Sequence, residues 1–270
     1  RGEKVWQTEA IDPTLIAAPT VYVFAGQTGE LLSSWGKNRF VMPHGLTVDQ
    51  EDSVWLTDVG LHQVFKFDRA GNLLLTLGEA GVPGSDAAHF NRPTDVAVAA
   101  DGSFYVSDGY VNSRIVHFAA DGRYLLEWGR LGTKPGEFDL PHSLDVDAHG
   151  RVYVADRGNA RVQIFDADGR YLTSWHDELQ IGRPWAVRVG PDGFVYVVDG
   201  GDQNEWLPDR ARIVKLTPAG AVVDRFGGYG REPGQFIWPH ALAIAPDGAV
   251  FVAEVGQGQR AQKLFDGGLR

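Results

Sequence analysis

The sequence predicts an all-β protein, a six-bladed β-propeller whose first and last blades are incomplete. Five copies of one segment recur along the 270 residues, and each copy alternates apolar and polar residues with a period of two. No segment shows the 3.6-residue period of an amphipathic helix, which excludes a helical solenoid. The 34 glycines and 14 prolines suit a chain with many turns.

The copies divide the chain into the blades of a single propeller domain over residues 1–270. Two strands joined by a turn such as Asp101-Gly102 are followed by an acidic residue, a loop, a third strand, and a fourth strand ending in Trp-Gly or Leu-Gly. We expect a partial blade at 1–36, which lacks its two inner strands, and a last blade without its outer strand. The five blades that follow the partial one begin near residues 43, 92, 141, 183 and 239.

Composition excludes several classes of function. The chain has no cysteine, so disulfides, thiolate metal sites and cysteine nucleophiles are impossible. A net charge of −10 without a run of Lys or Arg argues against nucleic-acid binding. No stretch approaches the roughly 18 apolar residues of a membrane helix, and no leader-like segment opens the chain. We therefore expect a soluble monomer, cytosolic or already processed, that binds neither nucleic acid nor membrane.

Three Pro-His pairs mark one position in alternate copies. They are Pro43-His44, Pro141-His142 and Pro239-His240, and successive pairs are 98 residues apart. Two blades fit that interval, so in a six-bladed ring the three imidazoles would point at a common axis from about 120° apart.

A single histidine beside a strand start is more often a packing residue than a ligand. Three in one register favour a metal instead, because the blades between them carry Pro93-Thr94 and Pro184-Trp185 at the matching position. Three neutral imidazoles with an open position are typical of catalytic zinc.

The loops between second and third strands should reach the same rim as the histidines. One of them contains Tyr110, whose hydroxyl could serve chemistry or simply lie in water. An acidic residue at one position of every blade is expected to cap loop amides rather than catalyse. These residues are Asp58, Asp108, Asp156, Asp199 and Glu254.

Four strings in these copies carry a resemblance to a known family. They are PHGL, TDVGLHQVFKFD, PGSDAAHFNRPTDVAV and VSDGYVNSRIV. The copies resemble NHL repeats, and the strings resemble the lyase domain of peptidylglycine α-amidating monooxygenase from residue 1 to about residue 265. The resemblance implies a secreted or periplasmic lyase that converts a small or peptide substrate with a C-terminal α-hydroxyglycine into an amide and glyoxylate.

The resemblance also assigns roles to individual residues. It implies a catalytic zinc on His44, His142 and His240, a catalytic tyrosine at Tyr110, and a substrate-facing arginine at Arg1. Zn²⁺ and Arg1 would lower the pKa of Tyr110 from its ordinary value near 10 so that its phenolate could act as a base. Arg1 could equally clamp the substrate carboxylate with two hydrogen bonds, and the sequence does not separate the two roles.

Other positions differ from the family's pattern. Trp238 replaces a methionine before the third pair, and we expect it to line the substrate pocket with Met42 and Asn112. Ala241 replaces the aspartate that binds a structural Ca²⁺ in the family, so we do not expect that calcium, although the Leu46 carbonyl could contribute a ligand.

The family's disulfide cysteines are absent, and Val111 stands where one would be. Two other classes of function stay open at this point. One is a non-enzymatic platform for protein partners, and the other is a metal-dependent propeller lyase or lactonase with a different substrate.

Overall fold

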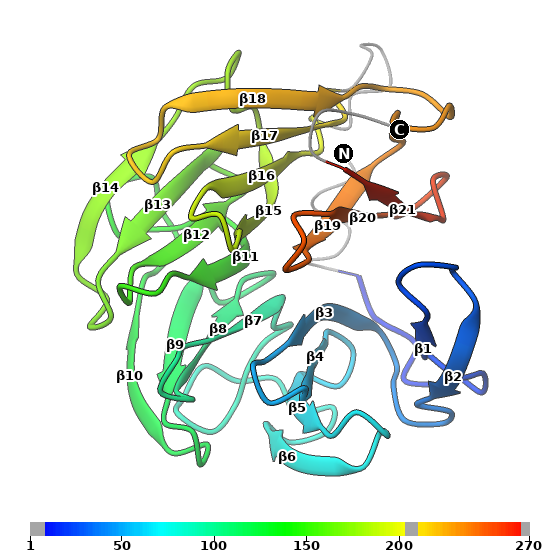
Figure 1. The fold of residues 1–270 in the computed structure, drawn as a ribbon. Coiled ribbons are helices and arrows are strands. Elements are labelled where there is room, and N and C mark those ends of the chain that lie inside the picture. The colour runs from blue at the N-terminus through cyan, green and yellow to red at the C-terminus, as the bar shows by residue number, and fades with distance from the viewer. Residues whose placement is uncertain (1–8, 203–209, 266–270) are drawn as a thin grey trace. The chain divides into compact units, whose positions relative to one another are not determined.

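The computed structural model describes residues 9–202 and 210–265, and every regular element in them is a β-strand (Figure 1). The chain divides into two compact units, Arg1–Leu126 and Glu127–Arg270. In the described ranges no helix is long and apolar enough to cross a membrane.

The first unit begins with a two-stranded sheet of β1 (Val21–Phe24) and β2 (Leu31–Trp35). A four-stranded meander follows: β3 (Pro43–Val48), β4 (Val54–Asp58), β5 (Gln63–Phe67) and β6 (Leu73–Leu77). The next meander is β7 (Asp95–Val98), β8 (Phe104–Asp108), β9 (Arg114–Phe118) and β10 (Tyr124–Trp128), whose last residues belong in sequence to the second unit.

The second unit continues the same order of strands. One meander is β11 (Pro141–Val146), β12 (Val152–Asp156), β13 (Arg161–Phe165) and β14 (Tyr171–Trp175). The next is β15 (Pro184–Val189), β16 (Val195–Asp199), β17 (Arg212–Leu216) and β18 (Val222–Gly227). A three-stranded sheet ends the described chain: β19 (Pro239–Ile244), β20 (Val250–Glu254) and β21 (Ala261–Leu264).

The described residues form a β-propeller fold of five blades, so the predicted count of six was wrong. Four blades have four strands and the last has three. Strands β1 and β2 pair only with each other, with a register shift at Val23/Phe24 like that at Lys66/Phe67 between β5 and β6. They have the register of an outer strand pair, but no inner strands accompany them among the described residues.

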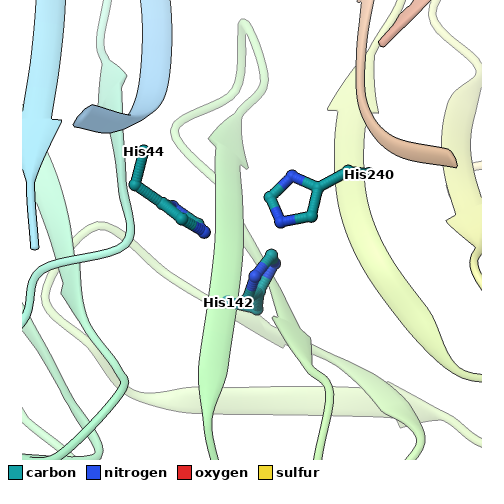
Figure 2. Close-up of side chains that lie close together, drawn as sticks. All are labelled: His44, His142 and His240. Atoms are coloured by element: carbon teal, nitrogen blue, oxygen red, sulfur yellow. The ribbon is translucent and has the colours of Figure 1, made fainter. Parts of the chain in front are cut away.

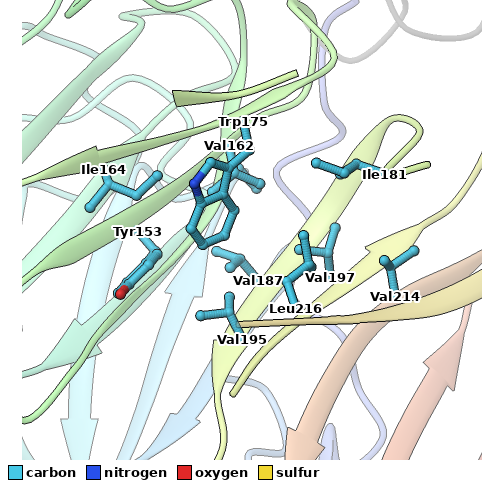
Figure 3. Close-up of a cluster of buried hydrophobic side chains, with 11 residues drawn as sticks. Tyr153, Val162, Ile164, Trp175, Ile181, Val187, Val195, Val197, Val214 and Leu216 are labelled. Carbon is cyan, nitrogen blue, oxygen red and sulfur yellow. The ribbon is translucent and has the colours of Figure 1, made fainter. Parts of the chain in front are cut away.

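Local sequence explains the blades. Gly102 in the predicted Asp-Gly turn has a φ of 82°, a conformation that glycine adopts without steric cost. The middle strands are buried on both faces, and their Val, Ile, Phe and Tyr residues suit that position. Figure 3 shows one resulting core in the second unit, where Tyr153 and Trp175 pack with valines of the neighbouring blade such as Val187. In the first unit, Trp55, Phe104 and Phe118 belong to the corresponding core.

The recurring acidic residues cap loops, as expected. Asp58 accepts hydrogen bonds from the amides of Val41, Met42, Gly60 and Leu61, so it holds the entry to β3 against the loop after β4. Each Pro-His pair therefore begins a strand whose entry is tied to its own blade.

Candidate metal and catalytic site

His44 lies at the entry of β3 and is oriented by the next blade. Its Nδ1 lies 2.7 Å from the carbonyl oxygen of Thr94. Because a carbonyl oxygen can only accept, the ring hydrogen must sit on Nδ1. Nε2 then carries a lone pair, which is the form of imidazole that binds a metal ion.

Tyr110 lies in the loop between β8 and β9, on the same side of the unit as His44. Its amide nitrogen lies 3.3 Å from the Arg92 carbonyl, and its hydroxyl lies 3.0 Å from His44 Nε2. Only 5% of the residue is exposed. With the His44 hydrogen on Nδ1, the Tyr110 hydroxyl donates to Nε2. The structure thus brings together two residues that are 66 positions apart in sequence.

His142 and His240 form a second pair, within the second unit. They lie at the entries of β11 and β19, and their ring centroids are 4.7 Å apart with the planes at 75°. His142 is 2% exposed, and its Nδ1 lies 2.6 Å from the carbonyl oxygen of Trp185. The Trp185 ring also lies against His240, 5.6 Å between centroids. Both imidazoles are therefore held by packing and one by a defined hydrogen bond.

Sequence reasoning missed Arg157. This residue follows Asp156 in the loop after β12, is 3% exposed, and places its guanidinium carbon 3.3 Å from the centroid of the Trp185 ring. It puts a buried positive charge beside the tryptophan that contacts both histidines of this unit. The signal in the sequence was a cation directly after the recurring aspartate, where Gly109 and Gly200 stand in the neighbouring blades.

Figure 2 shows the three histidines together. Each offers one ring nitrogen, and these nitrogens all lie within 4.8 Å of one another, so the three could hold a metal ion. The donor set fits zinc, which accepts three imidazoles at about 2.0–2.1 Å and keeps a fourth position open for a reacting group.

His62 supports the loop that carries Tyr110. Its Nδ1 accepts a hydrogen bond of 3.1 Å from the amide of Arg92, the residue whose carbonyl faces the Tyr110 amide. Burial lowers the pKa of His62, the Arg92 guanidinium lowers it further, and Asp58 offsets part of this. His62 is therefore neutral in the folded protein at neutral pH.

We expect the free energy of unfolding to fall as the pH drops below about 6.5, the ordinary pKa of histidine. Below that pH the unfolded chain takes up a proton that folded His62 resists, so protonation favours unfolding until the lowered folded pKa is reached. Urea unfolding at several pH values should show this loss, and His62→Asn should reduce it, since asparagine tolerates the φ of 59° at this position. An equal pH dependence in the two proteins would contradict the assignment.

Comparison with known proteins shows the repeat type and the family of the chain. The NHL repeat model matches residues 40–67, 90–118 and 138–165. A Caenorhabditis elegans protein named as a probable peptidyl-alpha-hydroxyglycine alpha-amidating lyase is 38% identical over 94% of this chain and 75% of its own length. The chain belongs to the family of peptidyl-α-hydroxyglycine α-amidating lyases.

The chain also matches part of longer proteins. Peptidyl-glycine alpha-amidating monooxygenase A of Xenopus laevis is 37% identical over 94% of this chain, which spans 29% of that protein's length. Among solved structures, a streptogramin B lyase covers 84% of this chain and is itself covered over 66%, with a TM-score of 0.60 and 18% identity. At that identity the likeness shows the shared fold alone.

The other residues that the lyase-family resemblance singles out fall in different places. Arg1 lies outside the described residues. Asn112 donates from its amide nitrogen to the Gly84 carbonyl and to Asp108, so it braces a loop, and its place in a substrate pocket stays a prediction. Trp238 lies at the entry of β19, and its ring packs over Gly256. Met42 lies at the entry of β3, where its amide bonds to Asp58.

The two positions of the lyase family's calcium site lie in regular strands. Leu46 pairs with Leu56 between β3 and β4, and Ala241 pairs with Ala253 between β19 and β20. Alanine offers no side-chain oxygen, which is the reason for expecting no calcium here. That expectation stays a prediction.

Proposed function

We propose that this protein is a zinc-dependent lyase that cleaves the C–N bond of a peptidyl-α-hydroxyglycine, releasing the peptide amide and glyoxylate. Membership of the lyase family supports the reaction class. The observation that carries the residue assignment is the Tyr110 hydroxyl 3.0 Å from His44 Nε2, beside a histidine set that could hold a metal ion.

The reaction needs one proton to move and no oxidant. The substrate hydroxyl loses its proton as the C–O bond becomes a carbonyl, the C–N bond breaks, and the amide nitrogen gains a proton. Zinc, when bound by His44, His142 and His240, would supply a Lewis acid that lowers the pKa of the substrate hydroxyl and favours the phenolate of a neighbouring tyrosine.

We assign the proton transfer to Tyr110. Its oxygen lies next to the nitrogen that His44 would offer, its ring is buried, and its loop is held by the bond to the Arg92 carbonyl. As phenolate it would take the hydroxyl proton, and as phenol it would return a proton to the leaving nitrogen.

Arg157 is the described cation best placed to favour an acidic substrate. Its guanidinium is buried against Trp185, whose ring contacts His142 and His240. A positive charge in such surroundings attracts a carboxylate more strongly than it would in water. The C-terminal carboxylate of an α-hydroxyglycine is the group that it would attract. The same role is proposed for Arg1 on the family resemblance alone.

The proposal also covers the substrate pocket and the extent of the domain. We assign Trp238 and Met42 to the substrate pocket, because both lie in the residues that lead into a Pro-His strand. We also propose that residues 1–270 act as one propeller domain, since the repeat continues in sequence through the junction of the two units.

Incubation of the purified protein with an N-acyl-α-hydroxyglycine tests the function. We expect glyoxylate and the amide in equal amounts above the uncatalysed rate, loss of turnover with a zinc chelator, and recovery when zinc is restored. The matched control is the N-acylglycine, which lacks the hydroxyl and should release nothing. Absence of glyoxylate from the zinc-loaded protein would leave the fold and family standing without this function.

A further inference from the structure

We infer that Thr94 and Trp185 are positioning residues that set the ring orientation of His44 and His142 through their main-chain carbonyls. Both occupy the position of the Pro-His histidine in a blade that has none, because they follow Pro93 and Pro184. The inference rests on the proposed function, since it concerns the ligands of the metal site.

The same kind of contact is found among the described residues of each unit. His44 Nδ1 lies 2.7 Å from Thr94 O, and His142 Nδ1 lies 2.6 Å from Trp185 O. In both cases the acceptor belongs to the blade that follows the histidine's own. This contact gives a physical reason for the alternation of Pro-His blades with Pro-Thr or Pro-Trp blades. One blade presents the imidazole, and the next presents the acceptor for its N–H.

Buried hydroxyl groups hold the Thr94 carbonyl in place. The Thr57 hydroxyl donates to Thr94 O at 3.1 Å and accepts from the Gly45 amide at 2.8 Å. Thr94 is also tied to Ser107, through its amide to the Ser107 carbonyl at 2.7 Å and between the two hydroxyls at 2.7 Å. Thr57, Thr94 and Ser107 are all fully buried. Breaking such a bond leaves a buried polar group unsatisfied, so the network resists movement.

Gly45 allows the carbonyl to come this close. A Cβ at that position would lie 2.5 Å from Thr94 O, well inside van der Waals contact. A residue with a Cβ after His44 would therefore collide with the main chain of the neighbouring blade, which explains the glycine at this position.

At His142 a different device holds the acceptor. The Trp185 indole nitrogen donates to Gly201 O at 3.1 Å, and Arg157 stacks on the ring. A Cβ at Gly200 would lie 2.6 Å from the ring, so the loop packs directly on it. The indole fixes the residue whose carbonyl meets His142.

An acceptor on the second ring nitrogen of a histidine ligand fixes the tautomer and raises its basicity, and loss of such a partner typically weakens metal binding by about 10–100-fold. Thr57 and the Trp185 indole act one step further out, through the carbonyl. We therefore expect the lower end of that range when either is removed.

The test measures zinc affinity without substrate, by competition with a chromophoric chelator. Thr57→Val keeps the shape of the side chain and removes the donor, and it should weaken zinc binding by about 10-fold. Thr57→Ser restores a hydroxyl and should restore the affinity. Thr47→Val is the matched control, because the Thr47 hydroxyl also donates to a carbonyl of the next blade, Val96 O at 2.8 Å, away from His44. It should leave zinc affinity unchanged.

Trp185→Phe provides an independent variant on His142, because it removes the indole donor and retains an aromatic ring. The visible spectrum of the Co²⁺-loaded proteins should change with Thr57→Val or Trp185→Phe and not with Thr47→Val. Wild-type zinc affinity in both Thr57→Val and Trp185→Phe would overturn the inference alone. A wild-type protein that binds no zinc would overturn the proposed metal site and this inference with it.

Discussion

Tyr110→Phe is expected to lower turnover of an N-acyl-α-hydroxyglycine by about 10³-fold, within the 10²–10⁴-fold that general acid–base groups contribute. The variant removes the one oxygen that lies 3.0 Å from His44 Nε2 and keeps the buried ring. Zinc content should stay at the wild-type level, because the histidines retain their own partners. Turnover and bound zinc are measured on the same preparation.

Tyr229→Phe is the matched control for this variant, since Tyr229 is 52% exposed. It should behave as wild type. A fully active Tyr110→Phe protein would remove Tyr110 from the mechanism, whereas an inactive protein that has lost zinc would show that the hydroxyl supports the metal site and would leave its role in proton transfer unsupported.

His142→Ala should abolish both zinc binding and turnover. It deletes one of three nitrogens that lie within 4.8 Å of one another, and two imidazoles hold zinc far less tightly than three. His142 is also buried against His240, so the variant loses packing as well as a ligand. Zinc content after dialysis and glyoxylate release report the two effects.

His149→Ala is the control, because the His149 side chain is 81% exposed. It should keep zinc and activity. Circular dichroism before and after zinc addition separates loss of the ligand from loss of the fold. A folded His142→Ala protein that still binds zinc with wild-type affinity would overturn the ligand assignment.

Much of the fold could be predicted from local pattern. Alternating residues, Asp-Gly turns and the acid at the end of each second strand identified the blades, and the observed entry strands begin at or within three residues of the predicted positions. The number of blades could not be predicted in this way. A pattern identifies strands, but β1 and β2 become part of a blade only if inner strands pair with them.

The site was predicted less evenly. The regular spacing indicated the three histidines, because a repeat converts sequence interval into equivalent position. Asn112 was assigned to a pocket from its neighbourhood in sequence, and only the structure shows that its amide also donates to Gly84 O and Asp108. Arg157 was not predicted, because a cation after the recurring aspartate does not reveal that its guanidinium will stack on Trp185, a contact that forms only in the folded chain.

By itself the sequence determined the repeat, the register of the Pro-His pairs and the lyase family. All three are properties of residue type and spacing, which the chain carries before it folds. Only the tertiary structure decided which nitrogen of His44 and His142 is left able to bind a metal ion, because that choice depends on the carbonyls of Thr94 and Trp185. Every residue has a main-chain carbonyl, so residue type does not predict which carbonyl will accept a hydrogen bond from an imidazole.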